Sequence, residues 1–172
     1  MTEVAFHFNA PDKLGYACRL LRKAVAAGSR VVVTGDRATL QQLDVALWSF
    51  SPLDFVPHCN GASAGEAVLA RSPVVLHDTP RSAPHQQVLV NLGDTIPEGF
   101  ERFERLIEVV TASQADRDGA RERWKHYKDR GYAIDRHDLA GKEGPQAAAL
   151  RRPPPEGEQK TWGGPAFSGE SA

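Results

Sequence analysis

Apolar side chains follow two different periods along the first part of the chain. They occupy alternate positions over Thr2–Phe8, which predicts a half-buried strand. After Pro11 they recur every three or four residues, which predicts a helix that ends near Gly28. The apolar run over Arg30–Gly35 is uninterrupted, as is typical of an inner strand that is covered on both faces.

Predicted helices and strands continue to alternate in the following segments. Asp36 can cap a second helix. The apolar face of this helix is predicted to carry Leu40, Leu43, Leu47 and Trp48. Further strands are predicted over Asp54–His58, Ser72–Asp78 and Gln86–Leu92. Pro57 cannot donate a backbone hydrogen bond, so we expect the first of these strands to lie at an edge or to end there.

Two more helices are predicted before the composition changes. The first carries a core stripe made of Phe100, Phe103, Leu106, Ile107 and Val110. Ser113 can cap the second, and Gly131 can end it. Strands that alternate with helices predict a layered α/β domain with a largely parallel sheet and right-handed crossovers, although the pattern does not give the strand order.

The composition changes at about Gly141, which divides the chain into an α/β domain over residues 1–140 and a tail over residues 141–172. The tail is rich in Gly, Pro, Ala and Glu. It cannot bury enough apolar surface to offset the entropy of ordering, which predicts disorder. Trp162 and Phe167 stand isolated in it, either as short recognition anchors or as tail residues without a role.

The charge balance weighs against a general nucleic-acid binder. The chain has 21 basic and 22 acidic residues and a net charge of -1, whereas duplex-DNA binders usually carry a large basic excess. Anion binding would therefore depend on a local patch. The two cysteines have no close spacing, and no stretch has the pattern of a signal peptide or a membrane span, so we expect a cytoplasmic protein.

Motifs for catalysis are weak. Neither a G-x-x-x-x-G-K-[ST] loop nor a G-x-G-x-x-G after the first strand occurs. His58 and Cys59 are neighbours on an extended segment, so they should point to opposite sides and form no nucleophile–base pair. His77, Asp78 and His85 have no recognisable zinc spacing. We therefore expect no catalytic residue, no metal and no cofactor.

The last predicted helix combines cations with aromatic rings. Spacings of three and four align one basic row, consisting of Arg117, Arg121, Lys125 and Lys128. A neighbouring row, which we expect to dock onto the sheet, consists of Ala120, Trp124, Tyr127 and Gly131. This combination suits an acidic peptide that ends in a bulky side chain. The same residues also fit a solvated helix face above an ordinary core.

Two segments resemble the chi subunit of bacterial DNA polymerase III. They are "LDVALWSFSPLDFVPH" over Leu43–His58 and "ARERWKHYKDRGY" over Ala120–Tyr132, and the resemblance covers roughly residues 1–135. It implies a Rossmann-like three-layer fold without nucleotide chemistry. It also implies a non-catalytic accessory protein of the clamp loader, which tethers the replicase to single-stranded-DNA-binding protein. That contact is made with the partner's acidic C-terminal tail, which ends in Pro-Phe.

The resemblance further implies two partner-binding surfaces. Carried over by position, the tail-binding surface consists of Val110, Arg117, Arg121, Trp124, Lys125, Gly131 and Tyr132. The second surface, for the psi subunit and through it the clamp loader, falls on Trp48, Phe55, Val56 and Pro57. A genome that encodes chi need not encode psi, so a helicase is an alternative partner there. Neither surface implies a membrane, and nucleic acid is reached only indirectly.

The chain departs from the family in two respects. Trp124 stands where the family can have Tyr, and short members lack the tail after Gly141. Two other functions stay open beside the family's role. One is a nucleotide-binding α/β domain or small enzyme without recognisable motifs. The other is direct binding of single-stranded nucleic acid by the basic row, with Trp124 as a stacking platform.

Overall fold

The computed structural model describes residues 1–49 and 56–140. The strands are β1 (Glu3–Ala10), β2 (Val31–Thr34), β3 (His58–Asn60), β4 (Val74–Leu76), β5 (Val88–Asn91), β6 (Arg105–Thr111) and β7 (Ile134–Asp138). The helices are α1 (Lys13–Ala26), α2 (Arg37–Ser49), α3 (Glu66–Arg71) and α4 (Gln114–Asp129), with short 3-10 turns η1 (Pro80–Ser82) and η2 (Phe100–Arg102). The tail that was predicted to be disordered lies outside the described residues.

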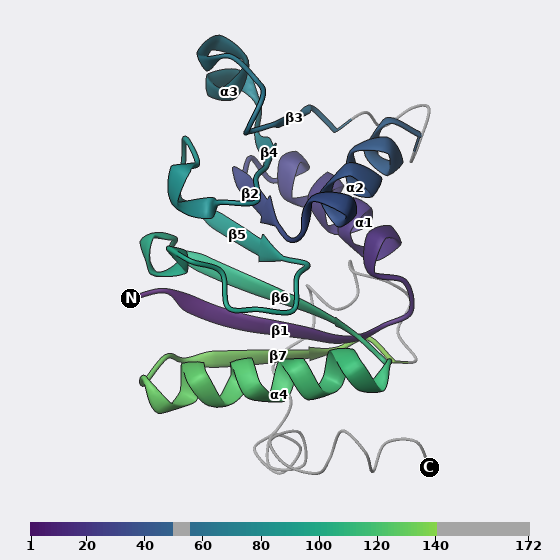
Figure 1. Cartoon of the computed structure of the whole chain (residues 1–172), viewed down its shortest axis with the longest axis vertical. Helices are drawn as coiled ribbons and strands as arrows, with labels where there is room; N and C mark the ends of the chain where they lie inside the picture. The colour runs from purple at the N-terminus through teal and green to yellow at the C-terminus, as the bar shows by residue number, and fades with distance from the viewer. Residues whose placement is uncertain (50–55, 141–172) are drawn as a thin grey trace.

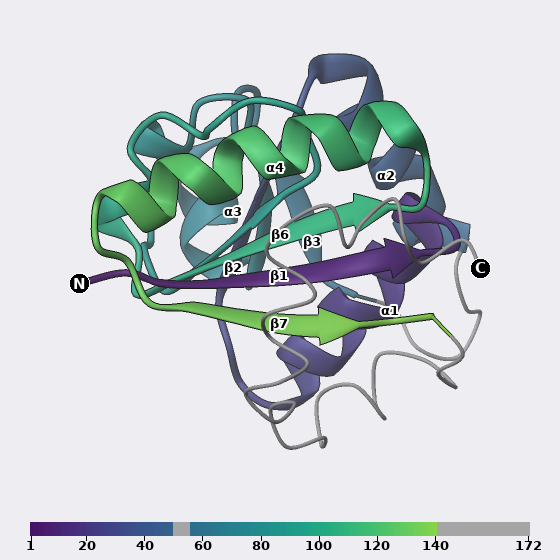
Figure 2. The same cartoon turned by 90° about the horizontal axis from the view of Figure 1, so that it is seen from below.

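The strands form one seven-stranded sheet in the order β3-β4-β2-β5-β6-β1-β7, and all of its pairs are parallel (Figure 1). The prediction of a layered α/β fold with a mostly parallel sheet is therefore confirmed. Helices α1 and α4 lie on opposite faces of the sheet (Figure 2). The core is divided in the same way, with Leu21 and Leu43 on the α1 side and Phe6 and Tyr127 on the α4 side.

The helix predicted over Phe100–Val110 is wrong. The chain forms the turn η2 and then the inner strand β6, which pairs with β5 and β1. Ile107 and Val109 enter the core on the α1 side, whereas Leu106 and Val110 enter the core on the α4 side. A strand covered on both faces needs apolar side chains at nearly every position, and such a run also contains the spacings of a helix.

Elements near the other edge of the sheet differ as well. Helix α3 and strand β7 were not predicted, and β3 begins only at His58. Pro57 precedes this strand, which is an edge strand as expected. Trp48 does not share the buried face of α2 with the three leucines but is 63% exposed. Its placement on the apolar face of the helix is therefore wrong.

A histidine and a tyrosine form a hydrogen bond inside the α1 side of the core. His7 on β1 bonds through Nδ1 to the hydroxyl of Tyr16 on α1, and the ring of His137 on β7 lies 4.6 Å from the His7 ring between centroids. Burial lowers the pKa of His7 well below 6.5, and the nearby His137 and Arg105 lower it further. The folded protein thus keeps His7 neutral at pH values where the unfolded chain takes up a proton.

We expect the free energy of unfolding to fall as the pH drops below 6.5, the ordinary pKa of this side chain. The contribution of His7 is complete above that pH and is lost below it, because only the unfolded chain then gains a proton there. One such group contributes at most about 1.4 kcal/mol per pH unit. Urea unfolding of His7→Gln should show a shallower decline, and an unchanged slope would contradict this assignment.

Candidate partner-binding surfaces

Helix α4 begins and ends where its sequence predicts. The hydroxyl of Ser113 accepts a hydrogen bond from the first turn, and Gly131 follows the last turn with a φ of 83°. The side chains that face the sheet are Ala120, Arg123 and Tyr127, all of which are buried. The predicted docking row is confirmed for Ala120 and Tyr127, but the sequence did not identify Arg123 as an inward residue.

Arg123 and Tyr127 both bind one carboxylate in the middle of the sheet. Glu108 of β6 is 0% exposed. Arg123 Nε donates to its Oε1 at 3.0 Å, and the Tyr127 hydroxyl donates to its Oε2 at 2.6 Å. Asn91 Nδ2 on β5 also donates to Oε1 at 3.0 Å. Charge-assisted hydrogen bonds, which are stronger than neutral ones, thus fix the inward face of the helix to the sheet.

Burial governs the protonation of this network. It raises the pKa of Glu108, while the guanidinium of Arg123 and the hydrogen bonds from Tyr127 and Asn91 limit that rise. Burial also raises the pKa of Tyr127, and the adjacent Glu108 carboxylate raises it further, so that the hydroxyl stays a donor. Removing one member leaves the others buried without compensation, which costs more than breaking a surface pair.

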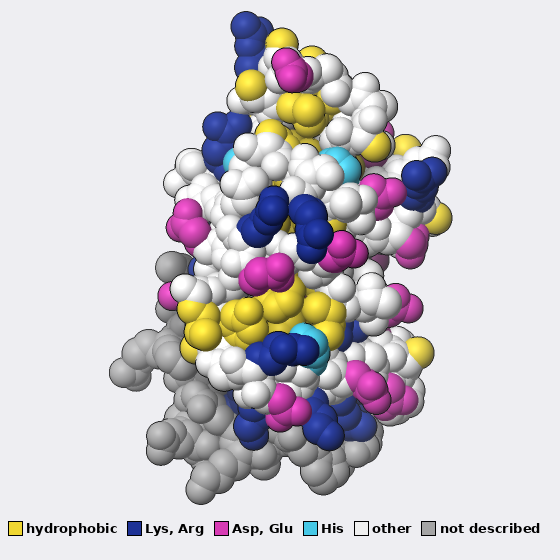
Figure 3. All heavy atoms as spheres, turned by 60° about the vertical axis from the view of Figure 1, so that its left-hand side comes forward, with side chains coloured by type: hydrophobic (Ala, Val, Ile, Leu, Met, Phe, Trp, Pro, Cys, Tyr) yellow, Lys and Arg dark blue, Asp and Glu magenta, His cyan; other side chains and the backbone are white. Residues whose placement is uncertain are grey.

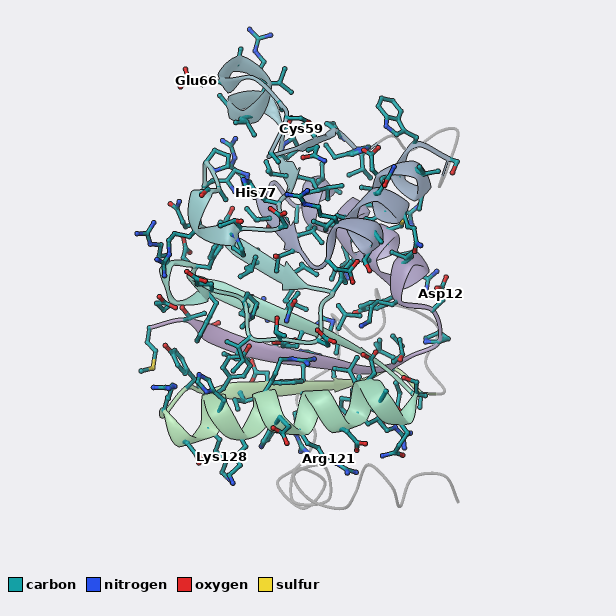
Figure 4. The ribbon with its side chains drawn as sticks, in the orientation of Figure 1. Asp12, Cys59, Glu66, His77, Arg121 and Lys128 are labelled. Carbon is teal, nitrogen blue, oxygen red and sulfur yellow. The ribbon has the colours of Figure 1, made fainter. Side chains whose placement is uncertain are left out.

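The outward flank of α4 carries the four cations of the predicted basic row. At 3.6 residues per turn, positions 117, 121, 125 and 128 fall on one strip. Lys125 and Lys128 are exposed and Arg117 and Arg121 are partly so. Figure 4 shows Arg121 and Lys128 directed away from the sheet. Arg121 Nη1 lies 3.5 Å from Oδ1 of Asp118, an exposed pair of the kind that contributes little to stability.

Two aromatic residues, Trp124 and Tyr132, lie beside the basic row and pack against residues of the domain. Trp124 is partly buried, and its ring centroid is 5.4 Å from that of Phe6 on β1. Tyr132 is also partly buried and packs against Phe100 with the same centroid separation of 5.4 Å. Figure 3 shows Lys and Arg side chains beside an apolar area on one side of the molecule. Val110, in contrast, is completely buried, so we leave it out of the surface proposed below.

Arg136 is a further cation of this region that the sequence analysis missed. It lies opposite Phe6 in the pairing of β7 with β1. Because side chains alternate along a strand, it shares the α4 face with Ile134, which packs against the core on that side. Its own side chain is buried. The alternation of Ile134 and Arg136 was the available signal, but a short segment with several charged residues is easily taken for a loop.

The second predicted surface lies at the opposite edge of the sheet, beside β3. The exposed ring of Trp48 packs against the ring of His58 with a centroid separation of 5.4 Å. Pro57 is exposed, whereas Val56 is buried. Phe55 lies outside the described residues. The structure therefore presents two of the four predicted residues, Trp48 and Pro57, to solvent.

The neighbouring His58 and Cys59 point to opposite faces of the sheet, as predicted. Cys59 enters the core on the α4 side, while His58 Nε2 forms a hydrogen bond of 2.9 Å with Asp44 Oδ1 on α2. Within the described ranges, no three His, Cys, Asp or Glu side chains gather as a metal site would require. None of the helices in those ranges combines the length and hydropathy of a membrane-spanning segment.

Several protein groups lie at one of the points where a doubly wound sheet could bind a nucleotide. This point lies at the carboxyl ends of β2 and β5, whose connections leave in opposite directions. The backbones of Gly35 and Gly93 lie side by side, and a Cβ on Gly35 would be in ordinary contact with the Gly93 nitrogen at 3.5 Å. The carboxylate of Asp36 occupies the first turn of α2, and Lys13 is paired with Asp116 at 3.1 Å. An acidic cap disfavours phosphate at this helix end.

Comparison with known proteins identifies related chains. The family model described as DNA polymerase III chi subunit, HolC, matches residues 1–135. The chain is 33% identical over 144 residues to DNA polymerase III subunit chi of Pseudomonas aeruginosa, which covers 81% of this chain and 98% of the relative. It is 27% identical to the proteins of the same name from Haemophilus influenzae and Escherichia coli, over 72% and 69% of this chain and 85% and 80% of theirs.

Two arginines of α4 that are two positions apart should differ sharply in their effect on stability. Arg123→Met leaves the Glu108 carboxylate buried without its cation and should lower the free energy of unfolding by about 3–5 kcal/mol. Arg121→Ala, in the basic row, should change the free energy of unfolding by less than about 0.5 kcal/mol. Denaturant unfolding of both variants measures the difference, and similar losses would show that the buried network does not hold the helix.

Proposed function

The chain belongs to the DNA polymerase III chi subunit family, and from this premise we propose that it tethers the replicase to single-stranded-DNA-binding protein. In this proposal it binds the partner's acidic C-terminal tail, which ends in Pro-Phe, and it contributes no catalytic group. The binding surface comprises the basic row, which is Arg117, Arg121, Lys125 and Lys128, together with Trp124, Gly131 and Tyr132.

The observation that carries the proposal is the arrangement of α4. Its buried face is fixed through Glu108, Arg123 and Tyr127, and four cations lie on the flank that this leaves in contact with solvent. Cations on a rigid helix attract an acidic peptide from solution, and an arginine can bind a carboxylate through two parallel hydrogen bonds. Arg121 lies in the middle of the row, and its pair with Asp118 joins two side chains of the same helix that solvent can reach.

The aromatic residues supply the apolar part of the surface. Trp124 and Tyr132 are only partly buried, so each residue keeps part of its surface exposed to solvent. In partner interfaces, a few aromatic and arginine contacts usually carry most of the binding energy. A peptide that ends in Phe can therefore place its ring against these side chains while its acidic residues lie along the basic row.

A second partner surface is proposed at the other edge of the sheet. Trp48 is exposed there although a tryptophan gains free energy by burial, and Pro57 is exposed beside it. We assign this surface, with Val56 beneath it and Phe55 next in sequence, to the psi subunit or, where psi is absent, to a helicase. Because α4 packs over β6 and three strands separate β6 from β3, both partners can bind at once.

Titration with a fluorescent acidic peptide ending in Pro-Phe tests the first proposal. We expect micromolar, salt-sensitive binding that is lost when the terminal Phe is removed. Arg121→Ala should weaken this binding by about 1–3 kcal/mol, the scale of a hydrogen bond to a charged group. Trp48→Ala is the matched control at the opposite edge and should leave the affinity for the peptide unchanged.

Three outcomes would oppose the proposal in different ways. Absence of peptide binding at low salt would rule out the proposed tail-binding function. Equal losses in Arg121→Ala and Trp48→Ala would show that the two surfaces are not separate. Tight binding of an oligonucleotide that falls steeply with salt would instead favour direct recognition of single-stranded nucleic acid.

A further inference from the structure

The described part of the chain ends next to the basic row. The backbone N–H of Ala140 donates to Oδ1 of Asp138 at 2.9 Å, and Asn9 Nδ2 donates to the same oxygen at 2.9 Å. Asn9 in turn accepts a hydrogen bond of 3.4 Å from Arg117 Nη2, the first cation of the row. Residues 141–172 therefore continue from a point beside the start of the basic row.

Residues 141–172 carry four basic and four acidic side chains, so their overall charge does not favour the basic row. Residues 156–167, in contrast, carry two Glu and one Lys together with two aromatic rings, a combination that suits this surface. Glu156 and Glu158 precede Trp162, and Pro165 precedes Phe167 two positions later. Acidic residues followed by bulky apolar side chains are the chemistry that the cations and the aromatic rings of α4 are suited to bind. Charge complementarity guides such an encounter, and a buried aromatic side chain holds it.

The length of the chain permits the contact. The 21 residues from 141 to 161 lie between Ala140 and Trp162, and they can span up to about 70 Å when extended. Helix α4 has 16 residues and is therefore about 24 Å long. A ligand tethered through a linker of this kind has an effective concentration on the order of millimolar. Even a contact of millimolar affinity would then occupy the surface about half of the time.

We propose that the segment Glu156–Phe167 docks onto the basic row and Trp124 of its own chain and competes there with the acidic partner peptide. The inference rests on the proposed function of this surface and adds a means of regulating it. A partner that presents many acidic tails at high local concentration displaces the segment, whereas a single dilute tail does so less readily. The segment thereby sets a threshold for partner binding.

The test uses the full chain with the double substitution Trp162→Ala and Phe167→Ala. Removing both anchors should strengthen binding of the fluorescent acidic peptide by about two- to tenfold, because the internal competitor is lost. Leu150→Ala is the matched control, since it removes an apolar side chain from the linker that precedes the segment. It should leave the affinity for the peptide unchanged.

A second readout needs no peptide. The indole N–H resonance of Trp124 in a ¹⁵N correlation spectrum should move in the double variant and stay in place in Leu150→Ala. A resonance that does not move overturns the inference, as does an unchanged peptide affinity in a protein that binds the peptide. A shift that grows with protein concentration would assign the contact to a second copy and contradict docking within one chain. If neither protein binds the peptide, the proposed function fails, and the Trp124 resonance alone decides whether the segment docks.

Discussion

The buried carboxylate of Glu108 is the constraint on which the candidate surface depends. A carboxyl group in the middle of a sheet is costly unless donors reach it, and Arg123 and Tyr127 of α4 supply two of them. Only one rotation of the helix about its axis brings both side chains over β6. That rotation also determines which residues face outward. The contact with Glu108 on the inner side of the helix therefore fixes the position of the basic row on its outer side.

The same sheet separates the two proposed partners. Helix α4 packs over β6 and β1, whereas the Trp48 surface lies beside β3, and strands β4, β2 and β5 lie between them. At the carboxyl ends of β2 and β5, the backbones of Gly35 and Gly93 lie side by side, and Lys13 nearby is paired with Asp116. Both proposed binding surfaces lie on outer faces of the fold, in a chain that belongs to the DNA polymerase III chi subunit family.

Sequence patterns predicted the fold class and α4 because their signals are local and strong. Ser113, Gly131 and the spacing of the cations define one helix, and the run over Arg30–Gly35 contains an inner strand. The helix predicted over Phe100–Val110 failed because a strand buried on both faces also contains helical spacings. Trp48 was placed inward by its type and spacing, whereas the burial of α2 depends on where α1 and the sheet lie.

The parts of the site that sequence reasoning missed depend on contacts between distant segments. A single Glu in an apolar strand, such as Glu108, indicates a buried partner, but only the fold shows that the partner is Arg123. Arg136 became visible only when β7 was found beside β1. The roles assigned to the cations and to Trp124 stay predictions, because they concern a partner and not the fold.

The most direct test of the central claim is to map the acidic Pro-Phe peptide onto the protein by ¹⁵N correlation spectra during a titration. Our account predicts that shifts concentrate on backbone amides from Arg117 to Tyr132, while the amides around Trp48 stay in place. Shifts centred on the β3 edge, or none at saturating peptide, would contradict it.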